Sequence, residues 1–246
     1  MLTEQRKQLL LDRLARDGRI VAKELSAELR LSEDTIRRDL RELAGEGRLT
    51  RVHGGALPAS PTVANIAARR SMATDEKSRL GRKAASLIQR RQRVFIDGGT
   101  THLELVRALP LGLDFTVITH SPTIAAALEP HQAVEVILIG GRLFRHSMVA
   151  VGAEALEQIQ RLRIDLGFVG LTGLHPEEGG TTGDFEEAAI KRAMIARSAE
   201  TVVLVTAEKL GAVSAFNVCA MKDLTSIVVT RETEVKAFAG VEIIRA

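Results

Sequence analysis

The apolar positions of the first 55 residues recur with the spacing of three short helices and then alternate as in a strand. These elements are predicted, in order, over residues 3–17, 20–30, 32–44 and 49–53. Gly18 ends the first helix, because glycine is favoured just past a helix C-terminus. Ser32 is a favourable N-cap residue for the third helix. A small, mainly helical module is therefore expected at the start of the chain.

From residue 94 onward, short β-branched runs alternate with helical stretches. The predicted strands are 94–97, 115–119, 134–139, 166–169, 201–206, 226–230 and 241–244. Such apolar strands, separated by stretches long enough for crossover helices, are typical of a parallel sheet covered on both faces. Residues 57–65 contain two prolines and several small residues, which is typical of a linker. We therefore expect a module over 1–56, a linker over 57–75 and an α/β domain over 76–246.

The formal net charge of +3 is distributed unevenly along the chain. The balance is +2 over residues 1–56, +7 over 57–93 and −6 over 94–246. A basic N-terminal part and an acidic C-terminal part indicate two separate functions, and the basic part is expected to bind a polyanion. For residues 57–93 a second interpretation is equally good, namely that the arginines only solvate surface helices.

The composition narrows the compartment and the kinds of partner. The single cysteine, Cys219, allows no internal disulfide, so a reducing, cytoplasmic setting is expected. No apolar run approaches the roughly 20 residues of a membrane span, and the first residues lack the apolar core of a signal peptide. We therefore expect no membrane partner. Tryptophan and tyrosine are absent, which argues against single-strand binding by stacked aromatic side chains.

The third predicted helix has one apolar face and one charged face. At about 100° per residue, Ile36, Leu40 and Leu43 gather on one side. The opposite side carries Asp34, Arg37, Arg38 and Arg41. A short turn before such a helix is the arrangement of a helix-turn-helix, whose second helix enters the major groove of DNA. Arginines there can bind phosphates or guanine, and the spacing allows Asp34 to pair with Arg38. Periodicity alone leaves open a helical bundle with a solvated charged face.

Individual residues of this module resemble the N-terminal signature of the DeoR family of bacterial transcription regulators. The resemblance rests on Thr35-Ile36-Arg37-Arg38-Asp39-Leu40, on Leu43, and on Arg51-Val52-His53-Gly54-Gly55-Ala56. It covers residues 3–56 without a gap. It implies a winged helix-turn-helix, with a wing near 48–54, that binds double-stranded operator DNA. The residues that it implies for DNA binding are Ser32, Asp34, Thr35, Arg37, Arg38, Arg41, Arg51 and His53.

Several predicted strands of the second region end in glycines, hydroxyl residues or a lysine. These ends are Asp97-Gly98-Gly99-Thr100-Thr101, Thr119-His120-Ser121, Gly140-Gly141-Arg142, Gly170-Leu171-Thr172-Gly173 and Thr206-Ala207-Glu208-Lys209. In open α/β sheets, ligands bind beyond the carboxyl ends of the strands. Glycines let backbone N–H groups approach an anion, and helix N-termini favour negative charge. The pattern indicates a site for a phosphorylated small molecule, and simple tight turns are an equally good interpretation.

The second region also resembles the C-terminal sensor domain of the DeoR family. The resemblance implies an α/β fold similar to ribose-5-phosphate isomerase, glucosamine-6-phosphate deaminase and the CoA-transferases. It also implies an effector that is a phosphorylated sugar or a related metabolite. The implied effector-binding residues are Asp97, Gly98, Gly99, Thr100, Thr101, Thr119, Ser121, Gly140, Gly141, Glu187, Lys191 and Lys209. The chain departs from the family at His120, where asparagine is common, and at Thr206, where aspartate is common.

Three functions follow from these patterns. The first is a repressor of a carbohydrate catabolism operon that binds a palindromic operator as a homodimer or homotetramer and senses a sugar phosphate. The second is a sugar-phosphate isomerase or deaminase fused to a DNA-binding head, in which Asp97, Asp165, Glu187 and Lys191 shuttle protons. The third is a redox- or dinucleotide-sensing repressor. The six histidines are scattered and expected at the surface or in turns, so we expect no metal and no cofactor.

Overall fold

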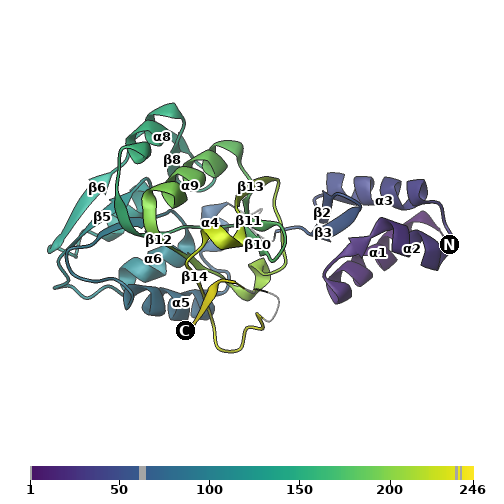
Figure 1. Cartoon of the computed structure of the whole chain (residues 1–246), viewed down its shortest axis with the longest axis horizontal. Coiled ribbons are helices and arrows are strands. Elements are labelled where there is room, and N and C mark those ends of the chain that lie inside the picture. The colour runs from purple at the N-terminus through teal and green to yellow at the C-terminus, as the bar shows by residue number, and fades with distance from the viewer. Residues whose placement is uncertain (1, 61–64, 236–237, 239) are drawn as a thin grey trace.

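The computed structural model describes residues 2–60, 65–235, 238 and 240–246. Its N-terminal module contains three helices and a small antiparallel sheet (Figure 1). The helices are α1 (Thr3–Asp17), α2 (Ala22–Leu29) and α3 (Glu33–Gly45). The sheet has the order β1-β3-β2, with β1 (Ile20–Val21), β2 (Leu49–Val52) and β3 (Gly55–Pro58). This is a winged helix-turn-helix, and β2 and β3 form its wing.

Local signals in the sequence set the ends of these helices. Gly18 follows α1 with φ 72°, a left-handed conformation that glycine adopts at little cost. The Ser32 hydroxyl accepts a hydrogen bond from a backbone N–H of the first turn of α3 and so caps that helix. The apolar face of α3 packs inward as predicted, and its core residues, at most 2% exposed, are Ile36, Leu40 and Leu43.

A buried ion pair joins α1 to α3. Asp39 is 1% exposed, and both of its carboxylate oxygens accept hydrogen bonds from the Arg6 guanidinium. A carboxylate buried without such a partner would be strongly destabilising. Asp39, although it belongs to the arginine-rich run of α3, therefore stabilises the module and does not face outward.

The larger part of the chain is built on a seven-stranded parallel sheet in the order β15-β14-β12-β9-β4-β5-β6. The four strands on the β4 side of the sheet are β4 (Arg93–Ile96), β5 (Phe115–Thr119), β6 (Val134–Leu138) and β9 (Ile164–Phe168). The other three are β12 (Ser198–Leu204), β14 (Ser226–Val229) and β15 (Glu242–Arg245). The order places β4 and β9 side by side at the centre and β6 at one edge.

Helices cover both faces of this sheet, as Figure 1 shows. One core contains residues of α5 (Thr74–Ala85), α6 (Thr100–Arg107) and α7 (Pro122–Ala127). The opposite core contains residues of α8 (Ala153–Gln160) and α9 (Phe185–Arg197). Because both faces are buried, nearly every side chain of the central strands is apolar, which explains their continuous hydrophobic runs.

Several shorter elements lie at the ends of the sheet. A hairpin joins β7 (Arg142–Phe144) to β8 (Val149–Val151). A second antiparallel sheet contains β10 (Gly173–His175), β11 (Gly179–Thr182) and β13 (Phe216–Cys219). The remaining helical segments are α4 (Ile66–Arg69), η2 (Ala207–Lys209) and η3 (Met221–Asp223). None of these elements was predicted from the sequence.

The seven strands predicted from apolar runs are all present in the parallel sheet, with ends shifted by at most three residues. The predicted boundary after residue 56 falls inside β3. Of the predicted 57–75 linker, residues 61–64 lie outside the described residues, and residues 66–69 form α4. The three-part division of the chain stays a prediction. Within the described residues, no helix combines the length and the apolar character that crossing a bilayer requires.

Candidate functional site

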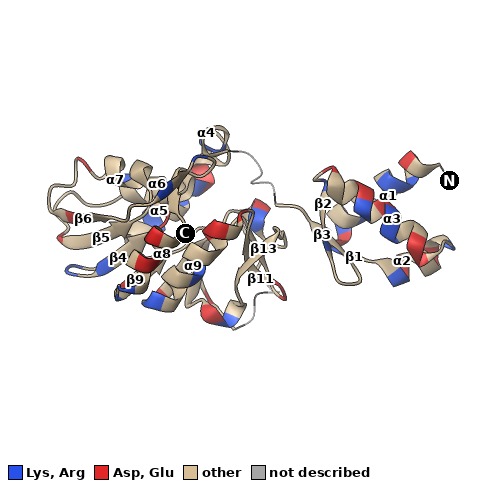
Figure 2. Ribbon diagram, turned by 90° about the horizontal axis from the view of Figure 1, so that it is seen from above, with Lys and Arg blue, Asp and Glu red and all other residues tan. Residues whose placement is uncertain are grey.

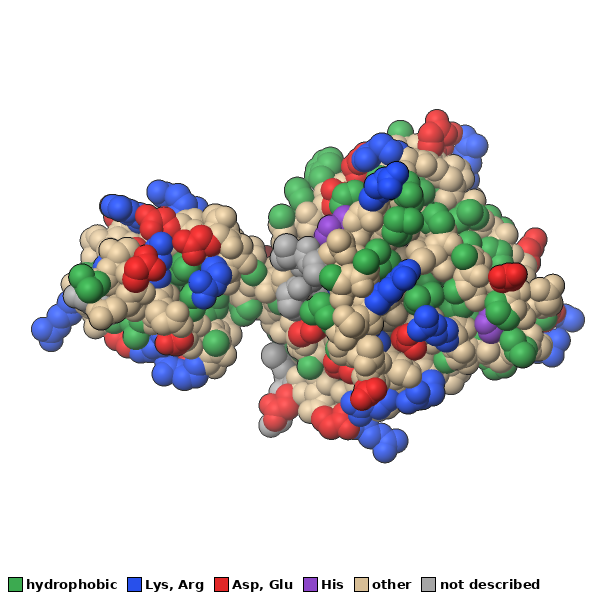
Figure 3. Space-filling view, turned by 180° about the vertical axis from the view of Figure 1, so that it is seen from behind, with side chains coloured by type: hydrophobic (Ala, Val, Ile, Leu, Met, Phe, Trp, Pro, Cys, Tyr) green, Lys and Arg blue, Asp and Glu red, His purple; other side chains and the backbone are tan. Residues whose placement is uncertain are grey.

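The outer face of α3 carries the predicted DNA-binding residues. Arg37, Arg38 and Arg41 are all exposed, opposite the side chains that pack into the core of the module. Basic and acidic residues alternate along α3 (Figure 2), and charged side chains of both signs lie on the surface of the module (Figure 3). The first turn of the helix, on its accessible side, holds three more of the predicted residues, namely Ser32, Asp34 and Thr35. The face is open to a large ligand.

Two of the arginines are paired with glutamates of the same helix. Arg37 donates to Glu33 at 2.6 Å, and Arg38 donates to Glu42 at 3.2 Å. Both pairs are solvent-exposed, so each contributes little to stability and the arginines can exchange partners for phosphate. The spacing also allows Arg38 to pair with Asp34, one turn earlier in the helix. Arg38 pairs instead with Glu42, one turn later.

A hollow separates α3 from the wing. It is lined by Ala22, Arg37, Leu40, Arg51, Val52, His53, Gly54 and Gly55. Arg51 and His53 are exposed, and they approach Arg37 across this hollow although they belong to another element. The structure therefore brings the wing residues and the helix residues onto one side of the module.

The larger part of the chain has a pocket at the carboxyl ends of its central strands. Its walls are the loop after β4, the first turn of α6, the loop after β9, α9, η2 and α4. The lining residues are Arg69, Met72, Lys77, Gly98, Gly99, Thr100, Thr101, His102, Ser147, Gly170, Leu171, Thr172, Thr182, Glu187, Lys191, Leu204, Glu208 and Lys209. Seven of the twelve predicted effector residues are among them, and the segments around Gly98 and Lys209, distant in sequence, meet there.

Four cationic side chains line this pocket, namely Arg69, Lys77, Lys191 and Lys209. Burial and the neighbouring cations Arg69, Lys77 and Lys191 lower the pKa of Lys209 to about 8. Burial also lowers the pKa of Lys77, whose ammonium group donates to two backbone carbonyls, one of them that of Arg69. Mutually repelling cations in a partly desolvated pocket are stabilised when an anion enters.

Two polar groups at the pocket are buried without a partner. Arg69 Nε and Thr182 Oγ1 make no hydrogen bond within the described part of the chain. In the same part of the chain, neither the Arg69 guanidinium nor the Lys209 ammonium forms an ion pair. Buried polar groups are almost always satisfied in folded proteins, so unsatisfied groups that line a pocket indicate a place for a ligand or water.

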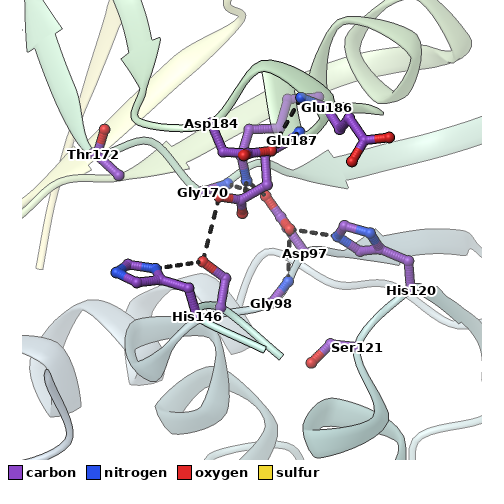
Figure 4. Close-up of polar contacts among 12 residues, drawn as sticks. Asp97, Gly98, His120, Ser121, His146, Gly170, Thr172, Asp184, Glu186 and Glu187 are labelled. Atoms are coloured by element: carbon purple, nitrogen blue, oxygen red, sulfur yellow. Dashed lines mark hydrogen bonds and ion pairs between the residues drawn. The ribbon is translucent and has the colours of Figure 1, made fainter. Parts of the chain in front are cut away.

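Asp97 is the centre of a buried network beside the pocket (Figure 4). One carboxylate oxygen accepts from the Gly98 amide and from His120 Nε2, each at 2.7 Å. The other accepts from Lys191 Nζ at 2.6 Å and from the Gly170 amide at 2.8 Å. Burial opposes ionisation, but Lys191 and His120 outweigh it and hold the pKa of this carboxyl well below its usual value. Asp97 therefore holds two strand-end loops in place, and its oxygens are occupied.

Three histidines are buried. His120 and His131 lie in loops, whereas His102 belongs to α6 and departs from the expectation of a surface or turn position. His102, His120 and His131 are at most 6% exposed. His120 Nδ1 lies 2.8 Å from the Ala150 carbonyl oxygen, so both ring nitrogens have a polar neighbour. Burial and the nearby Lys191 ammonium lower the pKa of His102 to about 4, so its ring is neutral near pH 7.

Five predicted effector residues do not line the pocket: Asp97, Thr119, Ser121, Gly140 and Gly141. The Thr119 hydroxyl donates to the Ile96 carbonyl at 2.6 Å, and the Ser121 hydroxyl donates to the Met148 carbonyl at 3.1 Å. Both side chains are fully buried. Gly140 follows β6, and the sheet order puts this edge strand two positions away from β4. The glycine pair there serves the turn into β7.

Sequence reasoning missed several pocket residues. Arg69 comes from α4, inside the segment interpreted as a linker. Ser147 comes from the β7–β8 turn and donates to Glu187 at 3.3 Å. Thr182 ends β11, which the sequence analysis did not predict. Two signals were present in the sequence: the arginine pair at 69–70 in a segment otherwise poor in charge, and the run Gly179-Gly180-Thr181-Thr182, which has the same character as the other strand ends.

A second hollow adjoins the pocket. It is lined by Ser60, Arg69, Phe144, His146, Ser147, Thr172, Gly183, Asp184, Glu187 and Ser214. Arg69, Ser147, Thr172 and Glu187 belong to both cavities. The cationic pocket therefore opens toward a region with carboxylates and hydroxyls, where a polar organic group attached to an anion can fit.

Comparisons with known proteins agree with this architecture. Residues 6–62 match the family model of the DeoR-like helix-turn-helix domain, and residues 72–231 match that of the DeoR C terminal sensor domain. The chain is 31% identical over 94% of its length to the HTH-type transcriptional repressor GlcR of Bacillus subtilis, covering 90% of that protein. It is 32% identical over 86% of its length to the glycerol-3-phosphate regulon repressor of Escherichia coli, covering 84% of it.

Among solved structures, ribose 5-phosphate isomerase A of Methanocaldococcus jannaschii is similar with a TM-score of 0.41, at 16% identity and over 55% of this chain and 54% of that one. The translation initiation factor eIF-2B of Pyrococcus horikoshii is similar with a TM-score of 0.43, at 15% identity and over 62% of each chain.

A winged helix-turn-helix joined to a parallel α/β domain with a cationic pocket defines a transcription regulator with a sensor domain. The family models and the relatives of similar length show that the chain belongs to the DeoR family of transcriptional regulators.

Proposed function

We propose that this regulator represses a carbohydrate catabolism operon and that a phosphorylated sugar or related metabolite modulates its binding to operator DNA. The observation that supports this most directly is the pocket, where Lys209 and Arg69 form no ion pair within the described residues and Arg69 Nε and Thr182 Oγ1 are buried and unsatisfied. A phosphate group supplies the charge and the acceptor oxygens that these side chains require. The names of the relatives, among them a glycerol-3-phosphate regulon repressor, support the same effector class.

Most of the predicted effector residues that line the pocket contact the ligand in this proposal, whereas Lys191 is engaged by Asp97. The Gly99 amide and the first turn of α6, with Thr100 and Thr101, receive the phosphate oxygens, because a helix N-terminus favours an anion. The Gly98 amide is bonded to Asp97, and this residue lines the pocket without donating to the anion. Lys209 and Arg69 neutralise the charge. Glu187, which adjoins the second hollow, accepts hydrogen bonds from hydroxyls of the organic part.

On the DNA side, we propose that α3 enters the major groove and that the wing follows the backbone. Arg37, Arg38 and Arg41 then contact phosphates or guanine edges, while Arg51 and His53 reach the adjacent groove or backbone. We propose that the operator is palindromic and that the protein binds it as a homodimer or homotetramer. In either assembly, two recognition helices lie about one DNA turn apart. A protein with this task acts on the chromosome, so the proposed location is the cytoplasm.

Two of the four residues named for the enzymatic alternative, Asp97 and Asp165, are not placed to shuttle a proton. A proton shuttle needs a carboxylate with a free oxygen facing the substrate. Asp97 has both oxygens occupied by four donors. Asp165 lies at the amino end of β9, where it pairs with Arg93, at the opposite end of the sheet from the pocket. We therefore propose binding without turnover.

The direct experiment measures DNA binding by full-length protein in the presence of phosphorylated sugars. The DNA is a fragment from upstream of the chain's own gene, and the ligands are ribose 5-phosphate, glucose 6-phosphate and glycerol 3-phosphate, each compared with its unphosphorylated form. We expect a shift of the DNA that one phosphorylated compound changes and that compound's free sugar or polyol does not. No shift at any salt concentration would refute the regulator, and turnover of a ligand would support the enzyme.

A further inference from the structure

The segment from Lys209 to Ser214 runs from the pocket to the DNA-binding module. Lys209 lines the cationic pocket, and Val213, four residues later, bonds to the N-terminal module. At no more than about 3.6 Å per residue, the Cα atoms of these two residues are within roughly 14 Å of each other. In Figure 1, β2 and β3 are the part of the small module that faces β10 and β11 of the larger one.

Val213 makes three hydrogen bonds across this junction. Its amide donates to the Pro58 carbonyl at 3.1 Å. Its carbonyl accepts from the Thr50 hydroxyl at 3.1 Å and from the Ser60 amide at 3.3 Å. Ala59 pairs with Val213 in a short parallel bridge. Because Thr50 belongs to β2 and Pro58 ends β3, one residue of the sensor domain holds both strands of the wing.

A second contact leads from the pocket wall to the same junction. Thr172 lines both cavities. Its carbonyl accepts a hydrogen bond from the Ser60 hydroxyl at 2.7 Å, and its own hydroxyl lies 2.7 Å from the Ser214 hydroxyl. The loop after β9, which supplies Gly170 to the Asp97 network, is thus bonded to the last described residue of the first module.

The 209–214 segment is also tightly packed against the second sheet. The Gly211 amide donates to the Leu174 carbonyl at 2.8 Å, and the Ser214 amide donates to Thr181 Oγ1 at 2.9 Å. A Cβ at Gly173 would lie 2.4 Å from the Ala212 carbonyl oxygen, so only glycine fits there. Because the segment is closely packed, a displacement of Lys209 is expected to move the residues that follow it, up to Ser214.

From these contacts we infer that residues 209–214, together with Thr172, couple the pocket to the wing: an anion that draws in Lys209 changes how Val213 holds Thr50 and Pro58. Arg51 follows Thr50 directly, so the change reaches a residue expected to contact DNA. This inference rests on the proposed function. Coupling requires that the segment has two conformations, one that favours DNA binding and one that does not, and that the anion binds them with different affinities.

The test uses full-length protein, inorganic phosphate as the probe and a Thr50→Val variant, which removes one hydroxyl at nearly constant shape. Calorimetry measures phosphate affinity, hydrogen exchange measures the response of residues 49–60 and 209–214, and a DNA shift measures the factor by which phosphate alters binding. We expect phosphate to change exchange in both segments of the unmodified protein. In Thr50→Val, phosphate affinity stays unchanged, and the effect of phosphate on DNA binding shrinks about two- to tenfold, the range for loss of one hydrogen bond.

Two further variants separate coupling from a purely structural role. Thr50→Ser keeps the hydroxyl and should restore the response to phosphate. Thr116→Val removes a threonine hydroxyl bond far from the junction, to the Glu135 carboxylate on the edge strand β6, and should leave the response intact. The coupling is refuted if phosphate binds but exchange over 49–60 does not change, or if Thr50→Val alters DNA binding equally with and without phosphate. Absence of any phosphate binding would instead overturn the anion pocket, and the coupling with it.

Discussion

Lys209 offers the sharpest test of the anion pocket, because its charge is expected to depend on pH near neutrality. Burial and the cations Arg69, Lys77 and Lys191 lower its pKa to about 8 in the free protein. A bound phosphate dianion favours the ammonium form and raises that pKa. Binding above pH 8 is therefore accompanied by proton uptake at Lys209.

The sign of the pH effect follows from this linkage. Well below pH 8, Lys209 is protonated in both the free and the bound state, so its titration adds no pH dependence to the affinity for a phosphate dianion. Above pH 8, the free protein loses the proton that the complex retains, and affinity falls by up to about tenfold per pH unit until the pKa of the complex is reached. A phosphate monoester, with a second pKa near 6, stays a dianion throughout this range.

Two variants assign the effect to this side chain. Lys209→Arg keeps a positive charge at all these pH values, so its affinity should lose the decline above pH 8. Lys209→Ala removes a charge-assisted hydrogen bond worth about 1.5–3 kcal/mol, which weakens binding about 10- to 150-fold at pH 7 and also abolishes the decline. DNA binding without effector should remain in both variants.

The assay is calorimetry with ribose 5-phosphate, or with whichever phosphorylated compound changes the DNA shift, between about pH 7 and pH 10. Since burial lowers the pKa of Lys77 as well, the comparison with Lys209→Arg decides which lysine titrates. Identical pH profiles for the unmodified protein and Lys209→Arg would show that Lys209 does not contact the anion.

Three further predictions concern the DNA-binding module. Arg38→Ala should weaken operator binding by about 1–3 kcal/mol if this arginine contacts a base, and sugar-phosphate affinity measured by calorimetry should not change. Arg41→Ala should weaken binding to all DNA sequences alike and reduce the salt dependence of binding by about one ion if Arg41 contacts a phosphate, which a titration over several salt concentrations measures. Arg6→Ala should lower the free energy of unfolding by about 3 kcal/mol in urea, because the buried Asp39 carboxylate loses its bidentate partner, whereas Arg13→Ala, which breaks an exposed pair with Glu28, should cost less than about 1 kcal/mol. Equal losses for Arg6→Ala and Arg13→Ala would contradict the burial argument.

Periodicity predicted the elements of both domains well because their sequence patterns are local. The apolar face of α3, with Ile36, Leu40 and Leu43, can be recognised within a single stretch of 13 residues. Each strand of the parallel sheet is likewise recognised as one mainly apolar run. The sequence analysis did not predict the β7–β8 hairpin or the sheet of β10, β11 and β13. Their strands are three or four residues long and are stabilised by partners elsewhere in the chain, as β11 is by β13.

The candidate site was predicted in part. Gly98 to Thr101, Glu187, Lys191 and Lys209 line the pocket, and each lies at the end of a predicted element or belongs to a recognisable motif. Thr119 and Ser121 have the same polar character in sequence, but their hydroxyls bond to backbone carbonyls in the interior. The sequence alone does not distinguish a hydroxyl that bonds to the backbone in the interior from one that is available to a ligand, because the difference depends on neighbours from other parts of the chain.

The order of residues along the chain was enough to indicate two domains, a recognition helix with an outward arginine face and strand ends suited to an anion, because each is a property of neighbouring residues. Folding decided which strand ends meet. The order β9-β4-β5-β6 keeps Gly98 close to Gly170 and carries Gly140 away to the edge. The same long-range contacts gave Asp97 four donors, added Arg69 to the pocket and joined Val213 to the wing. Apart from the Gly98 amide, the donors to Asp97 lie 23 or more residues away, and Thr50 and Val213 are 163 residues apart, so no local pattern encodes these contacts.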